Sequence, residues 1–270
     1  MIKSTFGIKH EPFNRPTETL LEQQQSIIDI IKIHAQQGGF SVIIGEPGVG
    51  KTTIKNHIES LANDRDISVV SFSRTMHTYM NILKQVAESF RLDVKNNKLE
   101  SDIIKSAYNL IKDRKTLYIL IDEAHLLEME VLRKLRLLFE RFPKKHNLIL
   151  FGQRDLLFYL SMTVNEDIKS RITFSQTLYP LNDEQMRDFI LSELDAVGLG
   201  HNTINEAALE LIIRSSQGKL RLCRNLCYGS LVQVCLGSER VVTNKHVNAV
   251  LVQPHWRTHE ELIKQQVSKT

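Results

Sequence analysis

Apolar residues follow two alternating patterns from the start of the chain to about residue 180. Short runs such as FSVII (40–44) and LYILI (117–121) are typical of buried strands. Longer segments with apolar residues three or four apart are typical of helices. The predicted strands are 40–44, 67–72, 117–121, 148–151 and 173–178, and the predicted helices are 17–37, 53–62, 79–90, 101–112, 128–142 and 155–160. This alternation predicts an α/β core with a parallel five-stranded sheet flanked by helices.

The pattern changes beyond Pro180, where only helical periodicity remains. Segments 182–197, 205–216, 220–236 and 243–251 are predicted to be helices, and Asn182 and Asn205 are placed to cap two of them. These helices predict a C-terminal α-helical lid. The predicted domains are an N-terminal linker and helix (1–38), the α/β core (39–180), the lid (181–251) and a basic C-terminal tail (252–270).

Composition is that of a soluble globular protein, with 42% hydrophobic and 24% charged residues. No apolar run approaches the about 18 residues that cross a bilayer, and the opening MIKSTFGIKHEPF contains no apolar signal core. We therefore expect a cytoplasmic location and no membrane partner. Three cysteines, Cys223, Cys227 and Cys235, are spaced along one helix face and are expected to be buried, reduced thiols.

Positive charge is concentrated at the C-terminal end. Residues 219–270 contain eight Lys or Arg and three Glu, whereas the whole chain has a net charge of only +4. Two interpretations stay open at this point. The segment forms a solvated basic face, or it contacts a polyanion such as nucleic acid.

The segment GEPGVGKTT (45–53) fits the phosphate-binding pattern G-x-x-x-x-G-K-[ST], with a predicted strand before it and a predicted helix after it. Its backbone N–H groups would surround the β-phosphate of a nucleotide. Lys51 would reach the β- and γ-phosphates, and the Thr52 hydroxyl would bind Mg²⁺. The predicted nucleotide-binding residues are Gly45, Glu46, Pro47, Gly48, Val49, Gly50, Lys51, Thr52 and Thr53.

A second motif, LYILIDE, ends a predicted strand in two acidic residues. Asp122 would hold the metal through water, and Glu123 would orient the attacking water as general base. The alternative is an acidic helix N-terminus, which Asp and Glu also favour. Both motifs in one chain predict binding of ATP with Mg²⁺, and hydrolysis of the ATP.

Residues 122–125 spell DEAH, the signature of a group of helicases. Those helicases pair two ATPase lobes, and only helices are predicted beyond Pro180. We therefore interpret His125 as a residue at the start of a helix near the nucleotide.

Three further residues are candidates for catalytic roles. Gln153 follows the strand 148–151 and is placed to sense the γ-phosphate. Arg171, just before the last strand, is expected to be an arginine finger that points into a neighbouring subunit's site. Arg221 begins a lid helix and is expected to face the nucleotide. For each arginine the alternative is an ordinary surface salt bridge.

Four segments together resemble AAA+ ATPases, specifically the ExeA-like branch. They are FGIKHEPFN, GEPGVGKTT, LYILIDEAHLL with LILFGQRDL, and GKLRLCRNLC. The resemblance covers roughly residues 6–251 and implies a P-loop AAA+ fold. It also implies that Pro12 and Phe13 lie near the adenine.

The ExeA-like branch contains two kinds of protein. Secretion-pathway members usually add a membrane span and a periplasmic domain, and the pattern of these residues predicts neither. The shorter members resemble transposition ATPases of the Mu B-protein and insertion-sequence helper type. That resemblance implies a regulator of DNA transposition, which assembles on duplex DNA as a ring or helical filament and recruits a transposase.

In such relatives the loops after the second strand line the channel that holds DNA. The corresponding residues here are Arg74, Thr75, His77, Lys95, Asn97 and Lys98, which would contact phosphates with little sequence preference. Solvated loops are the alternative for each of them. Two other functions also remain open: a secretion-type or signalling ATPase that acts on a protein partner, and a replication-loader-like ATPase.

Overall fold

The computed structural model describes residues 1–13, 20–72, 78–93 and 98–256, and its contacts divide the chain into two compact units. A helical unit contains Met1–Pro16 and Pro180–Thr270, and a sheet unit contains Thr17–Tyr179. The segment 1–38, which was predicted from the sequence to be a single N-terminal linker and helix, is therefore divided between the two units. Residues 1–16 go with the helical unit because α1 (Ile2–Phe6) packs against α11 (Leu220–Leu236).

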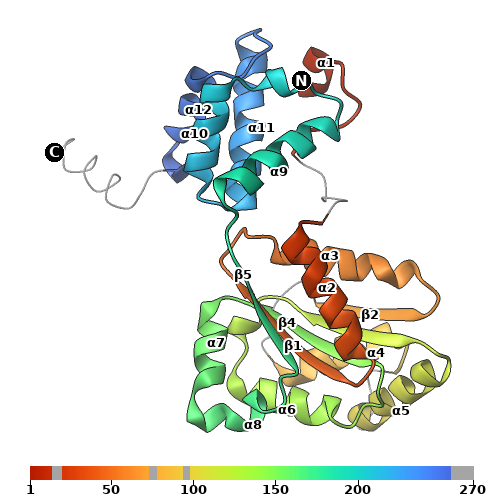
Figure 1. The fold of residues 1–270 in the computed structure, drawn as a ribbon. Coiled ribbons are helices and arrows are strands. Elements are labelled where there is room, and N and C mark those ends of the chain that lie inside the picture. Colours follow the sequence, from red (N-terminus) through yellow and green to blue (C-terminus); the bar gives the residue numbers. More distant parts are fainter. Residues whose placement is uncertain (14–19, 73–77, 94–97, 257–270) are drawn as a thin grey trace. The chain divides into compact units, whose positions relative to one another are not determined.

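The sheet unit is built on five parallel strands, as predicted. They are β1 (Gly39–Gly45), β2 (Ile67–Phe72), β3 (Thr116–Ile121), β4 (His146–Gly152) and β5 (Phe174–Leu178). Their order in the sheet is β2-β3-β4-β1-β5 (Figure 1). Strand β4 thus lies between β1 and β3, the two strands whose ends carry the phosphate-binding and acidic motifs.

Two layers of helices cover the sheet. Alternate residues of each strand point to opposite faces, so that Val42 and Ile119 belong to one apolar cluster and Ile43 and Tyr118 to the other. The first cluster is completed by α4 (Tyr79–Ser89), α5 (Leu99–Lys112), α6 (Met129–Phe139), α7 (Arg154–Ser161) and α8 (Glu166–Lys169), and the second by α2 (Glu22–Ala35) and α3 (Lys51–Ser60). The sheet is therefore buried on both sides, which fits the continuous apolar runs of its strands.

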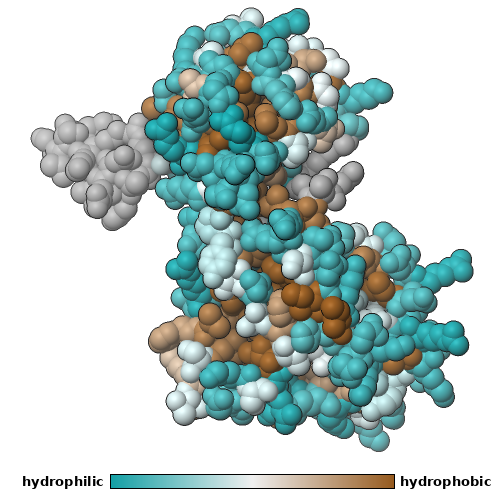
Figure 2. Space-filling view, viewed as in Figure 1, coloured by the Kyte–Doolittle hydropathy of each residue, from teal (hydrophilic) through white to brown (hydrophobic). Residues whose placement is uncertain are grey.

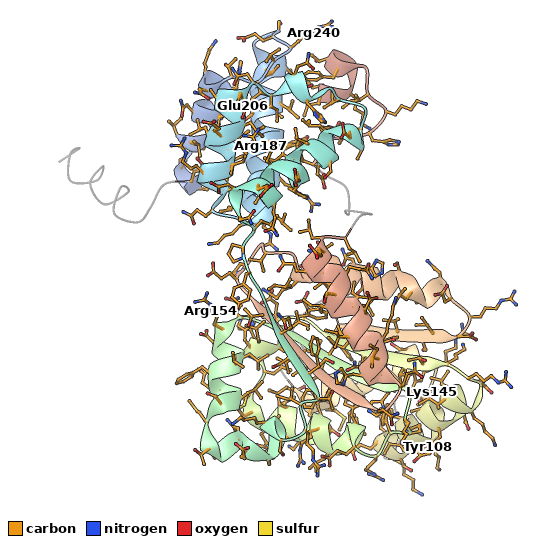
Figure 3. The ribbon with its side chains drawn as sticks, in the orientation of Figure 1. Tyr108, Lys145, Arg154, Arg187, Glu206 and Arg240 are labelled. Carbon is orange, nitrogen blue, oxygen red and sulfur yellow. The ribbon has the colours of Figure 1, made fainter. Side chains whose placement is uncertain are left out.

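The helical unit contains α1, α9 (Asp183–Asp195), α10 (Glu206–Ser216), α11 and α12 (Asn244–Leu251). Both predicted caps are confirmed: Asn182 Oδ1 accepts from the Gln185 N–H at 2.8 Å, and Asn205 Oδ1 accepts from the Ala208 N–H at 2.8 Å. In Figure 3, Arg187 of α9 and Glu206 of α10 lie close together, and they form an ion pair. All three cysteines are buried and free, as expected.

Five short 3₁₀ turns complete the described elements: η1 (Leu61–Asn63), η2 (Ala124–Leu126), η3 (Thr163–Asn165), η4 (His201–Thr203) and η5 (Pro254–Trp256). Apolar surface gathers over α7 and η3 in the space-filling view (Figure 2), where Leu157, Phe158 and Tyr159 of α7 and Val164 of η3 are exposed. Within the described residues, no helix combines the length and the apolar character that crossing a membrane requires.

Candidate functional site

The phosphate-binding loop connects β1 to α3, and its glycines have conformations that other residues adopt poorly. Gly48 has φ 88° and Gly50 has φ 111°, both in the left-handed region. At Gly45 a Cβ atom would lie only 2.8 Å from the Val49 side chain. The local sequence therefore specifies the tight turn that presents backbone N–H groups at the start of a helix.

Lys51 occupies the first position of α3 and is 8% exposed. Its Nζ donates to the carbonyl oxygens of Gly45 at 2.6 Å and Glu46 at 3.1 Å, so the ammonium group lies over the loop backbone. The Glu46 carboxylate lies 3.4 Å from Arg154, the first residue of α7. Arg154 follows β4 and Lys145 precedes it, and Figure 3 labels these two residues at opposite ends of the sheet.

Asp122 and Glu123 follow the last residue of β3, as the sequence motif predicts. Asp122 Oδ1 accepts from the Glu123 backbone N–H at 2.9 Å, and its Oδ2 lies 3.9 Å from Nζ of the buried Lys55. Carboxylate and hydroxyl oxygens are ligands that Mg²⁺ prefers, so Asp122 and the exposed Thr52 are a suitable donor set for that ion. They would hold it together with phosphate oxygens of a bound nucleotide.

Glu123 has φ 51° and ψ 36°, a left-handed conformation that is uncommon outside glycine. Such conformations concentrate at functional sites. Its side chain is 48% exposed, and its Oε2 lies 3.5 Å from Nε2 of His125. The same ring nitrogen lies 2.9 Å from the amide nitrogen of Gln153. A half-exposed carboxylate in this position can reach a water molecule at the sheet edge.

The strand register explains why these side chains meet. Ile44 is paired with Gly152, and Ile121 with Leu150, so the carboxyl ends of β1, β4 and β3 lie side by side. Gln153 follows β4 directly and therefore lies between the phosphate-binding loop and the acidic pair. The register therefore brings to one edge the three segments that the sequence proposes as parts of the site, because parallel strands place their carboxyl ends together.

Arg171 lies at the opposite end of the sheet unit. Its Nε is 2.9 Å from Glu140, and the neighbouring Thr173 donates its backbone N–H to the carbonyl of Phe40, near the amino end of β1. Five residues of strand, about 17 Å, separate Phe40 from Gly45. Arg171 lines a cavity of about 340 Å³ with Arg136, Lys144 and His146. It cannot reach the phosphate-binding loop of its own chain.

Three predicted nucleotide contacts belong to the helical unit. Pro12 and Phe13 are buried there, and Arg221 is the exposed second residue of α11. The neighbouring Arg224 instead contacts residues of its own unit. Its guanidinium lies 2.9 Å from Glu193 and 5.2 Å from the centre of the Phe189 ring.

The predicted DNA-contacting residues lie mostly outside the described part of the chain. Arg74, Thr75, His77, Lys95 and Asn97 fall in undescribed segments. Lys98 is described; it is exposed and directly precedes α5.

Two residues have contacts in the candidate nucleotide site that were not predicted from the sequence. Lys55 pairs with Asp122, and His125 contacts both Glu123 and Gln153. Lys55 lies one helical turn beyond Lys51, a spacing that could have indicated it.

Comparisons with known proteins agree with this architecture. The family profile described as "AAA domain" matches residues 33–160. No match was found among curated proteins. Solved structures with similar folds include the Aeropyrum pernix ORC2 protein in ADPNP–ADP complexes (TM-score 0.70, 17% identity, 93% of this chain and 71% of that chain).

Two further structures are similar. Cdc6p from Pyrobaculum aerophilum has a TM-score of 0.68 and 19% identity over 97% of this chain and 73% of that chain. The Aeropyrum pernix ORC1 protein, solved in complex with DNA, has a TM-score of 0.66 and 14% identity over 88% of this chain and 66% of that chain. The comparisons thus give no support for the ExeA-like or transposition branch. The chain has a P-loop AAA+ fold with a helical C-terminal region, and residues 33–160 match the AAA domain.

Proposed function

We propose that this chain is a DNA-associated AAA+ ATPase of the replication-loader type, which binds and hydrolyses ATP with Mg²⁺. One observation carries the ATPase part of the proposal. The phosphate-binding loop that leads to Lys51, the acidic residue Glu123 and the amide Gln153 follow the carboxyl ends of three neighbouring strands, β1, β3 and β4, and so lie along one edge of the sheet. This edge combines a phosphate-binding loop, a general base and a polar side chain that can contact the γ-phosphate.

Each residue has a distinct part in the proposed reaction. The N–H groups of the loop and the Lys51 ammonium bind the phosphates, and Lys51 exchanges its two carbonyl partners for phosphate oxygens. Glu123 orients a water molecule and accepts its proton. Gln153 donates a hydrogen bond to a terminal phosphate oxygen. The Mg²⁺ held by Thr52 and Asp122 neutralises phosphate charge when bound.

The solved structures with similar folds favour a replication-loader-like ATPase over a regulator of transposition. These include an ORC1 protein in complex with DNA and Drosophila ORC bound to DNA. The basic stretch from residue 219 adds support, because Lys and Arg side chains bind phosphates of any sequence. Binding of duplex DNA, self-assembly as a ring or filament, and a partner protein are all parts of this proposal. A transposase partner remains the alternative outcome.

The ATPase part is tested with Lys51→Ala. We expect loss of binding of a fluorescent ATP analogue by at least about tenfold, because the phosphates lose their only P-loop cation. Asn56→Ala, an exposed position on the same helix, is the matched control and should bind normally. Normal binding by Lys51→Ala would contradict the assignment of the loop.

The DNA part is tested by retention of random-sequence duplex at low salt. We expect retention with ATP, less retention with ADP, and a steep loss as salt rises from about 50 to 200 mM. Absence of retention under every nucleotide condition would exclude a DNA-associated function. Capture of a purified transposase, without any effect on loading of a replicative helicase, would favour the transposition regulator instead.

A further inference from the structure

We propose that His125 is a positioning residue that links Gln153 to Glu123 through one ring nitrogen. The proposal rests on the proposed ATPase function and names a regulatory link within that site. His125 Nε2 lies 2.9 Å from the Gln153 amide and 3.5 Å from the Glu123 carboxylate. These are the group that would contact the terminal phosphate and the group that would activate water.

The ring is held firmly in place. His125 is the middle residue of the turn η2, whose Ala124 is fully buried. Backbone hydrogen bonds from Leu126 to Glu123 and from Leu127 to Ala124 close the turn, and the His125 side chain is only 9% exposed. The left-handed Glu123 precedes this turn, so its conformation directs the chain from β3 into η2. A fixed ring presents one donor in a constant direction, so the two partners compete for the same hydrogen bond.

The surroundings of the ring determine which nitrogen carries the proton. Within the described part of the chain, Nδ1 of His125 is buried and has no hydrogen-bond partner. A buried N–H donor without a partner is rare and costs about 1–3 kcal/mol, whereas an unsatisfied acceptor is better tolerated. The neutral ring therefore carries its proton on Nε2. That N–H faces both Gln153 and Glu123.

An Nε2–H group needs acceptors, and this requirement fixes the orientation of the Gln153 amide. Rotation of the terminal amide by 180° places Oε1 at the position from which it accepts from His125. The amide NH₂ group is then free of the ring and can donate to another acceptor. A phosphate oxygen is only an acceptor, so this orientation also suits contact with a nucleotide. Two independent requirements lead to the same arrangement.

One proton facing two acceptors makes the two contacts interdependent. When Gln153 accepts from Nε2–H, the Glu123 carboxylate at 3.5 Å receives at most a weak share of that hydrogen bond. When Gln153 shifts toward a phosphate, the same N–H is left to Glu123 alone, whose exposed carboxylate moves closer to the fixed ring and is oriented by it. Occupation of the terminal phosphate position is thereby linked to the orientation of the base.

The tautomer is tested by NMR with isotope-labelled histidine, which distinguishes a protonated from an unprotonated ring nitrogen. The chain has 10 histidines, and the spectrum of His125→Leu identifies the signals of His125. We expect a protonated Nε2 and a bare Nδ1 in the nucleotide-free protein. A proton on Nδ1 would overturn the proposal. This measurement does not depend on ATP turnover, so it stands even if the proposed function fails.

The link itself is tested by a double-mutant cycle with His125→Leu and Gln153→Leu. For each variant we expect kcat to fall about 10- to 100-fold with KM within about threefold, and the double variant to be no slower than the slower single variant. His125→Gln should recover most of kcat, because an amide N–H can also donate to a carboxylate. Multiplicative losses, or an unchanged kcat in His125→Leu, would overturn the proposal.

A purely structural role is separated by thermal unfolding of each variant and by a control. His34→Leu replaces a histidine of the same unit whose ring stacks on Phe174 at 5.7 Å, and it should leave kcat unchanged. If wild-type protein neither binds nor hydrolyses ATP, the proposed function fails. If wild-type protein is active but the two single substitutions reduce kcat independently, so that their fold-losses multiply in the double variant, only the inference about His125 fails.

Discussion

His146 shows how burial of a single ring makes stability depend on pH. The side chain is 7% exposed at the start of β4, and its Nδ1–H donates to the carbonyl of Pro143 at 2.7 Å. Burial lowers the pKa of His146 below its usual 6.5, although the bond to Pro143 acts in the opposite direction. The folded protein therefore binds a proton at this ring less readily than the unfolded chain.

From this depressed pKa we predict a loss of stability in acid. Well above pH 6.5, the usual pKa of histidine, both states have a neutral ring and His146 adds no pH dependence. As the pH falls below 6.5 the unfolded chain is protonated first, so the free energy of unfolding decreases until the folded pKa is passed. Denaturant unfolding of wild type and His146→Leu between pH 7.5 and 5 checks this. The variant should have the shallower pH dependence, and equal slopes would contradict the prediction.

At the scale of elements, the turn between α10 and α11 depends on a close approach of backbones. Gly218 has φ 72°, and a Cβ atom there would lie 2.4 Å from the carbonyl oxygen of Leu181. The Leu181 N–H in turn donates to the Gly218 carbonyl at 2.9 Å. Gly218 thus ties the backbone at Leu181, just before α9, to the start of α11, within the motif GKLRLCRNLC.

We predict that Gly218→Ala destabilises the protein much more than Gly198→Ala. Gly198 also has positive φ (76°), but a Cβ atom there would meet nothing within 4 Å. Both changes have the conformational cost of alanine in the left-handed region, about 1–2 kcal/mol. Only Gly218→Ala adds a clash with backbone. Urea unfolding should show a clearly larger loss for Gly218→Ala, and equal losses would mean that the contact with Leu181 relaxes without cost.

The sequence predicted the long elements well and the short ones poorly. The five strands and the long helices were recognisable because each carries several turns or a full run of apolar residues. Helices α1 and α8 have only five and four residues, too few to show a period. The left-handed conformation of Glu123 and the contacts of His125 depend on strand register and on packing around η2. No local sequence pattern specifies those.

Features of the candidate site that depend on a local motif were predictable from the sequence, and those that depend on long-range contacts were not. The left-handed conformations of Gly48 and Gly50 follow from a motif with fixed spacing, so the loop could be predicted from the sequence. The position of Arg171 just before β5 was predicted, but its ion pair with Glu140 was not. Glu140 lies at the C-terminal end of α6 and approaches Arg171 only in the folded unit. Long-range ion pairs of this kind leave no periodic signal.

At the scale of the whole molecule, the position of Arg171 bears on how many chains make one site. The Arg171 side chain is 59% exposed and pairs with Glu140, which also contacts Arg136 at 3.0 Å. Pairs this exposed contribute only about 0–1 kcal/mol, so Arg171 can leave Glu140 for a stronger anion at little cost. About 17 Å of strand separates it from its own phosphate-binding loop. Any nucleotide phosphate that it contacts must therefore be held by the phosphate-binding loop of another chain.

We therefore predict that two inactive variants restore activity when mixed. Glu123→Gln subunits bind ATP and supply Arg171 but lack the base, whereas Arg171→Ala subunits have the base but supply no arginine. In a mixed assembly, an Arg171→Ala subunit beside a Glu123→Gln subunit has an intact base and receives a neighbour's arginine. The expected result is ATP turnover well above that of either variant alone, with a maximum at intermediate mixing ratios.

The matched control replaces the Glu123→Gln subunits with subunits that carry both Glu123→Gln and Arg171→Ala. These differ from the Glu123→Gln subunits only at residue 171 and supply neither a base nor an arginine, so no turnover should return. Recovery with the single variant and none with the double variant requires that the arginine acts between chains, because the two mixtures differ only at residue 171. If neither mixture recovers while sedimentation shows mixed assemblies, Arg171 has no role in a neighbour's site, and its pair with Glu140 is only structural.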